Sequence, residues 1–151
     1  MTDRPVHMLT ATAMTEAGLG APEHRSRPVD RSVLDGVDLV VTAEKAHRSA
    51  VLQVRPDLLR RTFTLDELVS LAEAVAPRRE DGRAEEALSS VLAERGRHPT
   101  TSEDLPDPVD AGPEEHQQMV AGVVAAVDRL VAALVAPTDR VSHAGAQAPG
   151  G

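Results

Sequence analysis

The chain has 151 residues, a formal net charge of -8 and no cysteine. The length fits one domain, and the acidic balance opposes binding to the phosphate backbone of nucleic acids. Without cysteine the chain has no disulfide, no thiolate metal ligand and no thiol nucleophile. Phe63 is the only aromatic residue, so we expect an aliphatic core of Val, Leu and Ala. No uninterrupted run reaches the roughly 20 apolar residues of a bilayer span, and the N-terminus lacks a signal-peptide pattern, which predicts a cytoplasmic protein.

The first predicted element is a helix that ends at a glycine. Val6, Leu9, Ala13 and Ala17 follow one another at spacings of three and four residues, and Gly18 comes directly after them. This spacing places the apolar side chains on one helical face, and a glycine in the left-handed conformation is a common helix terminus. A single helical turn is predicted for residues 29–34.

The clearest strand is predicted at residues 37–42, which read VDLVVT. A short β-branched run between a glycine and polar residues is typical of a strand that is buried on both faces of a parallel sheet. Thr42 is a candidate N-cap for the helix that follows, and Pro56 ends this helix. The apolar positions of the helix are Ala46, Ala50, Val51 and Val54.

A second strand and helix repeat this plan. Residues 61–65 form a brief run that favours a strand, and Thr64 with Glu67 has the spacing of a capping box at a helix start. The alternation of strand and helix predicts an α/β domain with parallel strands. The apolar positions of the second helix are Leu65, Leu68, Val69, Ala72 and Val75.

The rest of the chain is predicted to contain two helices, a loop and a tail. Residues 78–97 form a helical insertion, and residues 98–112 are rich in proline and acid and form a long loop. Pro113 begins the longest helix, which Gly112 or Asp110 caps. Residues 137–151 are small and polar and are expected to be disordered. The apolar stripe of the long helix is Val120, Val123, Val124, Val127, Leu130, Val131 and Leu134.

Three stretches together resemble the low-molecular-weight protein tyrosine phosphatase family. They read DGVDLVVTAEKAHRSAV at residues 35–51, RRTFTLDEL at 60–68 and DLPDPVDAGPEEHQQ at 104–118. Their order and spacing are similar to those of the family, and the resemblance covers a domain at residues 5–136. It implies a three-layer α/β/α fold with a short parallel sheet. The fold is incomplete, because the family's first strand, cysteine loop, helix and second strand have no counterpart here.

The resemblance implies that Asp107, followed by Pro108, descends from the family's general acid. Asp104 and Asp110 are nearby alternatives, but only Asp107 directly precedes a proline as the family pattern requires. From the residues alone, Asp107 also fits a loop aspartate whose carboxylate organises the turn before Pro108. We therefore expect Asp107 to be a vestigial general acid.

The chain has no Cys-x5-Arg segment, and the family's reaction depends on a cysteine nucleophile. The 151 residues are therefore expected to be inactive as a phosphatase. The alternatives are a non-catalytic module that binds a partner, a truncated gene model of an active phosphatase, and a decaying gene fragment. A purely helical interaction module is the main unrelated alternative. Arsenate reduction, the family's other reaction, requires still more cysteine.

No cofactor or metal is expected. The six histidines are far apart, and none forms a pair at i and i+4 or a His-x-Glu signature. His47 and Arg48 together could meet an anion, although a solvated helix face is the commoner outcome. The resemblance implies an apolar strand with an open edge, which predicts pairing with a second copy or with a protein partner. Nucleic acid and membrane are not expected as partners.

Overall fold

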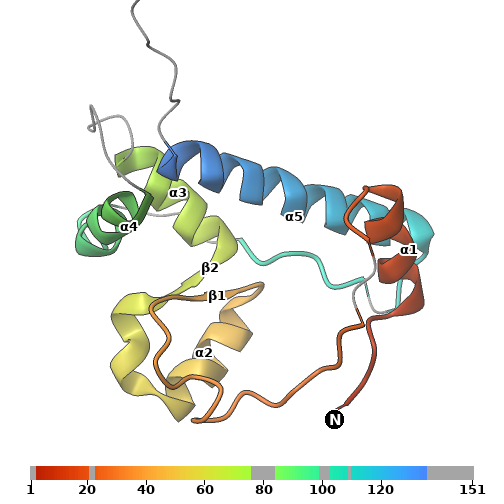
Figure 1. Cartoon of the computed structure of the whole chain (residues 1–151), viewed down its shortest axis with the longest axis horizontal. Helices are drawn as coiled ribbons and strands as arrows, with labels where there is room; N and C mark the ends of the chain where they lie inside the picture. Colours follow the sequence, from red (N-terminus) through yellow and green to blue (C-terminus); the bar gives the residue numbers. More distant parts are fainter. Residues whose placement is uncertain (1–2, 21–22, 76–83, 99–102, 109, 136–151) are drawn as a thin grey trace, which may run out of the picture.

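The computed structural model describes residues 3–20, 23–75, 84–98, 103–108 and 110–135. Five α-helices, one 3-10 helix and two short strands are defined in these ranges (Figure 1). In chain order the elements are α1 (Met8–Glu16), β1 (Val40–Thr42), α2 (Lys45–Val54), η1 (Pro56–Arg61), β2 (Thr62–Thr64), α3 (Leu65–Val75), α4 (Ala84–Ala93) and α5 (Pro113–Leu134).

The two strands form a parallel sheet at the centre of the larger lobe. Val40 pairs with Thr62, Val41 with Phe63 and Thr42 with Thr64. Helix α2 and the 3-10 helix connect the two strands and pack on one face of the sheet, while α3, α4 and α5 lie on the other. The predicted three-layer α/β/α arrangement with a short parallel sheet is therefore confirmed.

The main core lies between the sheet, α3, α4 and α5. Phe63 is its centre and is fully buried, because α3 begins directly after β2 and folds back over the strand. Seven of the eleven residues of α3 are buried. The residues of this cluster are Phe63, Leu68, Leu71, Ala72, Val75 and Val91, with Leu39, Leu92, Leu130, Ala133 and Leu134 packed against them.

A smaller core lies on the opposite face of the sheet. It consists of Leu34, Val51 and Leu58, and Val40 of β1 packs against it. Because neighbouring residues of a strand point to opposite faces, Val40 contacts this cluster while Val41 points to the side of Phe63. The α2 stripe predicted from the sequence supplies Val51 and Val54 here.

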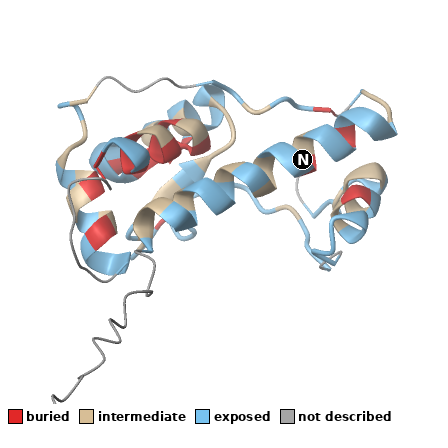
Figure 2. Cartoon of the chain, turned by 90° about the horizontal axis from the view of Figure 1, so that it is seen from above, coloured by how far each residue is buried: buried red, intermediate tan, exposed pale blue. Residues whose placement is uncertain are grey.

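Helix α5 joins the two parts of the molecule. Its C-terminal half packs on α3, and its N-terminal half packs on α1 (Figure 1). Figure 2 shows that most of its surface is exposed or half-buried. In the described part of the chain, α5 alone is long and apolar enough to cross a membrane, which is weak evidence because core helices of other proteins pass the same test. Glu114, Glu115, Asp128 and Arg129 interrupt its apolar sequence.

Several local predictions are confirmed. Gly18 has a positive φ of 77° after α1, and α5 begins at Pro113 with Gly112 as its N-cap. The capping box also forms, because the Glu67 amide donates to Oγ1 of Thr64 at 3.2 Å. Helix α4 lies within the predicted insertion at residues 78–97, and the predicted tail at 137–151 lies outside the described residues.

Four predictions about the first strand and its surroundings are wrong. Strand β1 begins at Val40 rather than at residue 37, because β2 offers only three residues for pairing. Val41 is 44% exposed instead of buried on both faces. Thr42 does not cap α2, since its hydroxyl donates to the carbonyl oxygens of Glu44 and Phe63. The predicted helical turn at 29–34 is instead a turn over residues 31–36.

Candidate functional site

The loop at Glu103–Pro108 lies against the carboxyl ends of both strands. The amide of Leu105 donates to the carbonyl oxygen of Ala43, which follows β1, at 3.0 Å. The amide of Glu103 donates to Oδ2 of Asp66, in the first turn of α3 after β2, at 2.9 Å. Ligands of α/β proteins bind at this edge of the sheet, so the loop occupies the place where a site of this fold is expected.

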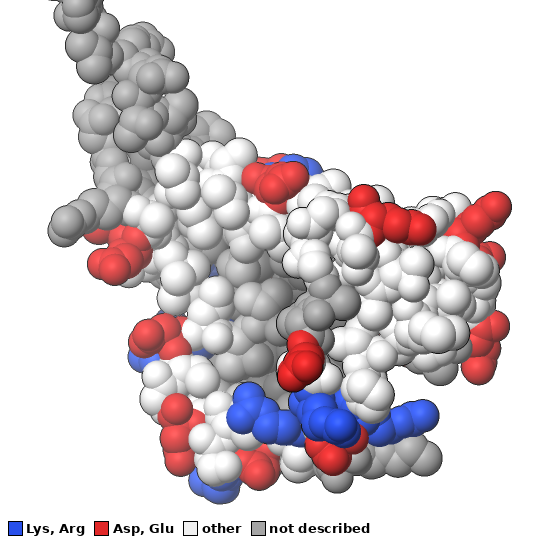
Figure 3. All heavy atoms as spheres, turned by 45° about the vertical axis from the view of Figure 1, so that its right-hand side comes forward, with Lys and Arg blue, Asp and Glu red and all other residues white. Residues whose placement is uncertain are grey.

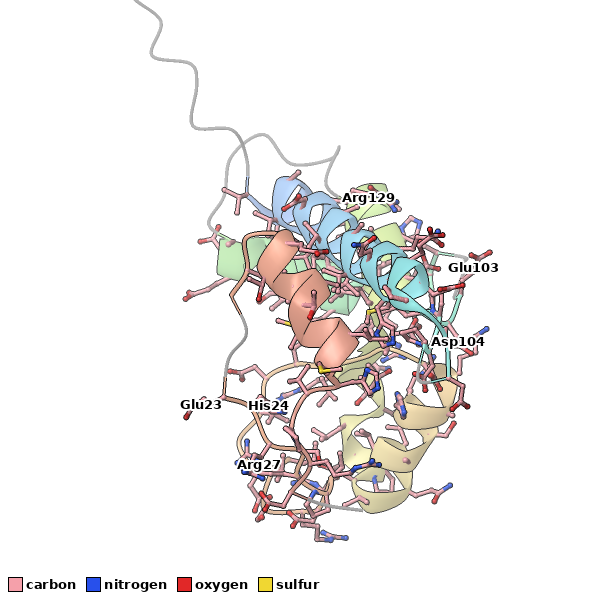
Figure 4. All side chains as sticks on the ribbon, turned by 90° about the vertical axis from the view of Figure 1, so that its right-hand side faces the viewer. Glu23, His24, Arg27, Glu103, Asp104 and Arg129 are labelled. Atoms are coloured by element: carbon pink, nitrogen blue, oxygen red, sulfur yellow. The ribbon has the colours of Figure 1, made fainter. Side chains whose placement is uncertain are left out.

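Asp104 ties the same loop to helix α2. Its Oδ1 accepts a hydrogen bond of 2.8 Å from the amide of Lys45, the first residue of the helix. Glu44, the N-cap residue by position, makes no capping bond with its side chain. Asp104 thus satisfies one of the free amides that every helix start carries, from a residue 59 positions away in the sequence (Figure 4).

The three aspartates weighed as the general acid differ in their surroundings. Asp107 is exposed, whereas Pro108 next to it is buried. Asp110 is exposed as well, and Asp104 is engaged by the start of α2. The assignment of Asp107 as the former general acid remains a prediction.

A buried ion cluster lies next to the loop, and the sequence analysis did not find it. Glu67, which is 8% exposed, accepts from Arg48 Nη1 at 3.0 Å and from Arg95 Nη2 at 3.3 Å. The cluster joins α2, α3 and the residues that follow α4. Arg48 is therefore engaged by a carboxylate. His47 is exposed, in agreement with the alternative that it lies on a solvated helix face.

Arg95 has a second role in the core. Its guanidinium lies 4.1 Å from the centroid of the Phe63 ring, and its Nη1 donates to the carbonyl oxygen of Leu59. Burial lowers the pKa of Arg95, and the Glu67 carboxylate works against this effect. The guanidinium is held on the aromatic face by a cation–π contact and by its carboxylate partner.

Further ion pairs hold the surroundings of the sheet together. Arg55 contacts Asp35 at 2.7 Å and Asp57 at 2.8 Å. The hydrogen bond from Arg55 lowers the pKa of Asp57 to about 2. On the other face, the Arg129 side chain of α5 holds Glu73 of α3 at 2.7 Å and thereby lowers the pKa of Glu73.

A polar cavity of about 400 Å³ lies at the opposite end of the sheet. Gly36 and Asp38, which precede β1, and Arg61, which precedes β2, line it together with Arg55 and Asp57. It is therefore at the amino ends of the strands. This places it away from the loop that carries Asp107.

Two histidines meet where α1 packs on α5. The His7 and His116 rings stack with their centroids 4.9 Å apart, and Nδ1 of His116 lies 2.9 Å from Oγ1 of Thr10. Nε2 of His116 is buried and has no hydrogen-bond partner among the described residues. In the same part of the chain, no group of three or more His, Asp or Glu side chains is arranged to hold a metal ion.

Comparison with known proteins supports the fold at low sequence identity. No protein-family model and no curated protein matches the chain. Among solved structures, the chain is similar to the YwlE arginine phosphatase from Geobacillus stearothermophilus, with a TM-score of 0.62 and 18% identity over 86% of this chain. It is also similar to Wzb from Vibrio vulnificus, solved with benzylphosphonate (0.58, 15%, 84%), and to the low molecular weight protein tyrosine phosphatase from T. tengcongensis (0.62, 17%, 86%).

The described chain therefore has the α/β fold of the low-molecular-weight protein tyrosine phosphatases, as the resemblance implied. It spans only part of these structures, namely 65%, 66% and 69% of their respective lengths. Figure 3 shows a face on which acidic side chains are dispersed, while Lys and Arg side chains gather in its lower part.

Proposed function

We propose that the 151-residue chain is a non-catalytic protein with the fold of a low-molecular-weight phosphatase. The observation that carries this proposal is the cysteine count of zero. In the family that the chain resembles, a thiolate attacks phosphorus and displaces the phenolate, which a general acid protonates. A thiolate suits this step because it is ionised and nucleophilic near neutral pH.

The groups at the carboxyl edge of the sheet cannot replace the missing nucleophile. A general acid contributes roughly 10²- to 10⁴-fold, and only to a reaction that the rest of the site supports. Asp107 alone would therefore give no turnover. The two arginines of the buried ion cluster, Arg48 and Arg95, are both engaged by Glu67, so neither presents a free guanidinium fork to a phosphate.

The uncovered edge of the sheet suggests that the chain acts by binding a polypeptide. Strand β1 pairs with β2 on one side, and no strand among the described residues pairs with its other side. An apolar strand with an open edge presents unpaired amide and carbonyl groups that favour association with another chain. We propose a binding role through this edge in the cytoplasm.

Hydrolysis of an aryl phosphate by the purified chain tests the inactive assignment. We expect no turnover above the uncatalysed rate, with wild type and Asp107→Ala giving the same result, and Glu103→Ala serves as a control in the same loop. Turnover by the wild type that Asp107→Ala abolishes would overturn the proposal.

A further inference from the structure

Helix α5 carries an exposed line of valines, which we call the valine strip. It consists of Val127 and Val131 together with Val135, the residue after the end of the helix; they are 42%, 51% and 50% exposed and are spaced four residues apart. The same side of the helix is covered further toward its N-terminus, where Val120 is buried and Gln117 donates to Glu16 of α1 at 2.7 Å. The strip is thus the uncovered continuation of a packed helix face.

The contacts of neighbouring residues show which way the valine strip faces. Arg129 reaches Glu73 on α3, and Leu130 packs into the core around Phe63. Two residues along an α-helix correspond to a rotation of about 200°, so Val127 and Val131 lie on the side of α5 opposite Arg129. Val127 and Val131 are therefore turned away from Glu73 of α3.

Strand β1 has its exposed surface on the same face of the sheet. Val41 and Phe63 are register partners and point to the same face, yet Phe63 is fully buried and Val41 is 44% exposed. Leu130 and Leu134 of α5 pack against the core cluster that contains Phe63, whereas Val41 is not part of this cluster. Val41 and the valine strip are therefore exposed apolar surfaces on the same side of the sheet, the side on which α5 packs.

We propose that a second copy of this chain covers this face through a two-fold axis beside β1. The inference rests on the proposed binding role of the open edge and names its partner. The axis pairs β1 with β1 of the second copy in antiparallel orientation and joins the two sheets into one four-stranded sheet. Both α5 helices then lie on the same face of that sheet, and the two valine strips approach each other across the axis. In such a two-fold interface, both copies contribute the same residues.

The charges at the two ends of β1 favour a second copy. Asp38 lies just before β1 and Lys45, the only lysine of the chain, lies just after it, and both are exposed. A two-fold axis reverses the strand direction, so Asp38 of one copy faces the Lys45 end of the other. The valine strip and the open edge of β1 contribute apolar side chains and backbone groups, which can pack and pair with the same groups of a second copy. The net charge of -8 opposes association, so added salt should strengthen it.

Sedimentation equilibrium of the full chain tests the proposal. We expect a species of twice the 16.0 kDa mass of one chain, with tighter association at higher salt. Val41→Asp and Val131→Asp should each weaken the dimer about tenfold or more, because each places a carboxylate inside the interface. Leu59→Asp is the matched control, since Leu59 is 52% exposed on η1 and should leave association unchanged. Circular dichroism establishes that each variant is folded.

Cross-linking tests the orientation of the two copies. A zero-length carbodiimide reagent joins Lys45 to a nearby carboxylate, and mixing isotope-labelled with unlabelled chain shows whether the link connects two copies. We expect a link between Lys45 and Asp38 of different copies, which Asp38→Asn removes.

A monomer at all concentrations would overturn the inference, as would a dimer that both aspartate variants leave intact. Binding of anionic lipid vesicles by a monomeric chain would assign the valine strip to a membrane instead. None of these outcomes bears on the aryl phosphate assay, so failure of the dimer and failure of the inactive assignment are distinguishable.

Discussion

The two strands of the sheet have the same length and are paired to each other, yet the more apolar strand is the more exposed one. Strand β1 reads VVT and β2 reads TFT. All three residues of β2 are buried, whereas the residues of β1 are half-buried or exposed. Burial is therefore decided by what the neighbouring elements cover, and no strand among the described residues covers the outer side of β1.

The difference follows from how each strand continues along the chain. Strand β2 leads directly into α3, which packs back on the sheet and brings Leu68 and Leu71 over Phe63. Strand β1 leads into α2, which packs on the opposite face and does not cover Val41. The β2 side forms a closed core, and the β1 side is the one to which the proposed second chain would bind.

The largest effect is expected from shortening Phe63. Phe63→Ala removes the only aromatic side chain from the main core and should lower the free energy of unfolding by about 3–5 kcal/mol, close to the whole stability of a small domain. Val41→Ala, its register partner, should cost about 0.5 kcal/mol or less in dilute solution. Chemical denaturation of the two variants measures both values.

Protein concentration sharpens this comparison. Association that covers Val41 stabilises the folded state by mass action. The loss of unfolding free energy caused by Val41→Ala should therefore rise with protein concentration. The loss caused by Phe63→Ala, which lies in the core of the monomer, should not rise by a comparable amount. Equal costs for the two substitutions in dilute solution would contradict the distinction between a closed and an open side.

Most helix and strand types could be predicted from the sequence because they depend on neighbouring residues. The capping box of Thr64 and Glu67, Gly18 after α1 and Pro113 at the start of α5 are all local patterns, and each is confirmed. The exposure of Val41 could not be predicted, because the sequence VDLVVT is the same whether or not a further strand lies beside it. The prediction that residues 37–42 form a strand buried on both faces assumed that the sheet was complete.

The second-largest effect on the free energy of unfolding is expected at Glu67, which lies near the end of β2. Glu67→Gln leaves the guanidinium groups of Arg48 and Arg95 without their carboxylate in a largely buried place and should cost about 3 kcal/mol. Glu44→Gln is the control, because Glu44 stands near the end of β1 and its side chain does not cap α2. Thermal unfolding compares them, and similar melting temperatures would show that the cluster does not stabilise the β2 side.

The Glu67 cluster also shows what sequence reasoning misses at the candidate site. Glu67 was recognised for its short-range capping bond, but its partners lie 19 and 28 residues away on other elements. Asp104 was weighed as a catalytic acid because it is close to Asp107, yet its carboxylate receives the amide of Lys45, 59 residues away. Ion pairs and caps at such separations depend on the tertiary arrangement, which the local pattern does not contain.

The smallest effect is expected at Asp104, on the β1 side of the sheet. Asp104→Ala removes the acceptor for the first amide of α2 and should lower the free energy of unfolding by about 1 kcal/mol, as for other N-cap acceptors. Glu103→Ala should be nearly neutral, since its contact with Asp66 uses the backbone amide. Denaturation curves of both variants provide the test. If Asp104→Ala and Glu103→Ala are equally neutral, the loop is not held to α2 by this bond. A loss confined to Asp104 would establish the carboxylate as a structural link between the loop of Asp107 and the helix after β1.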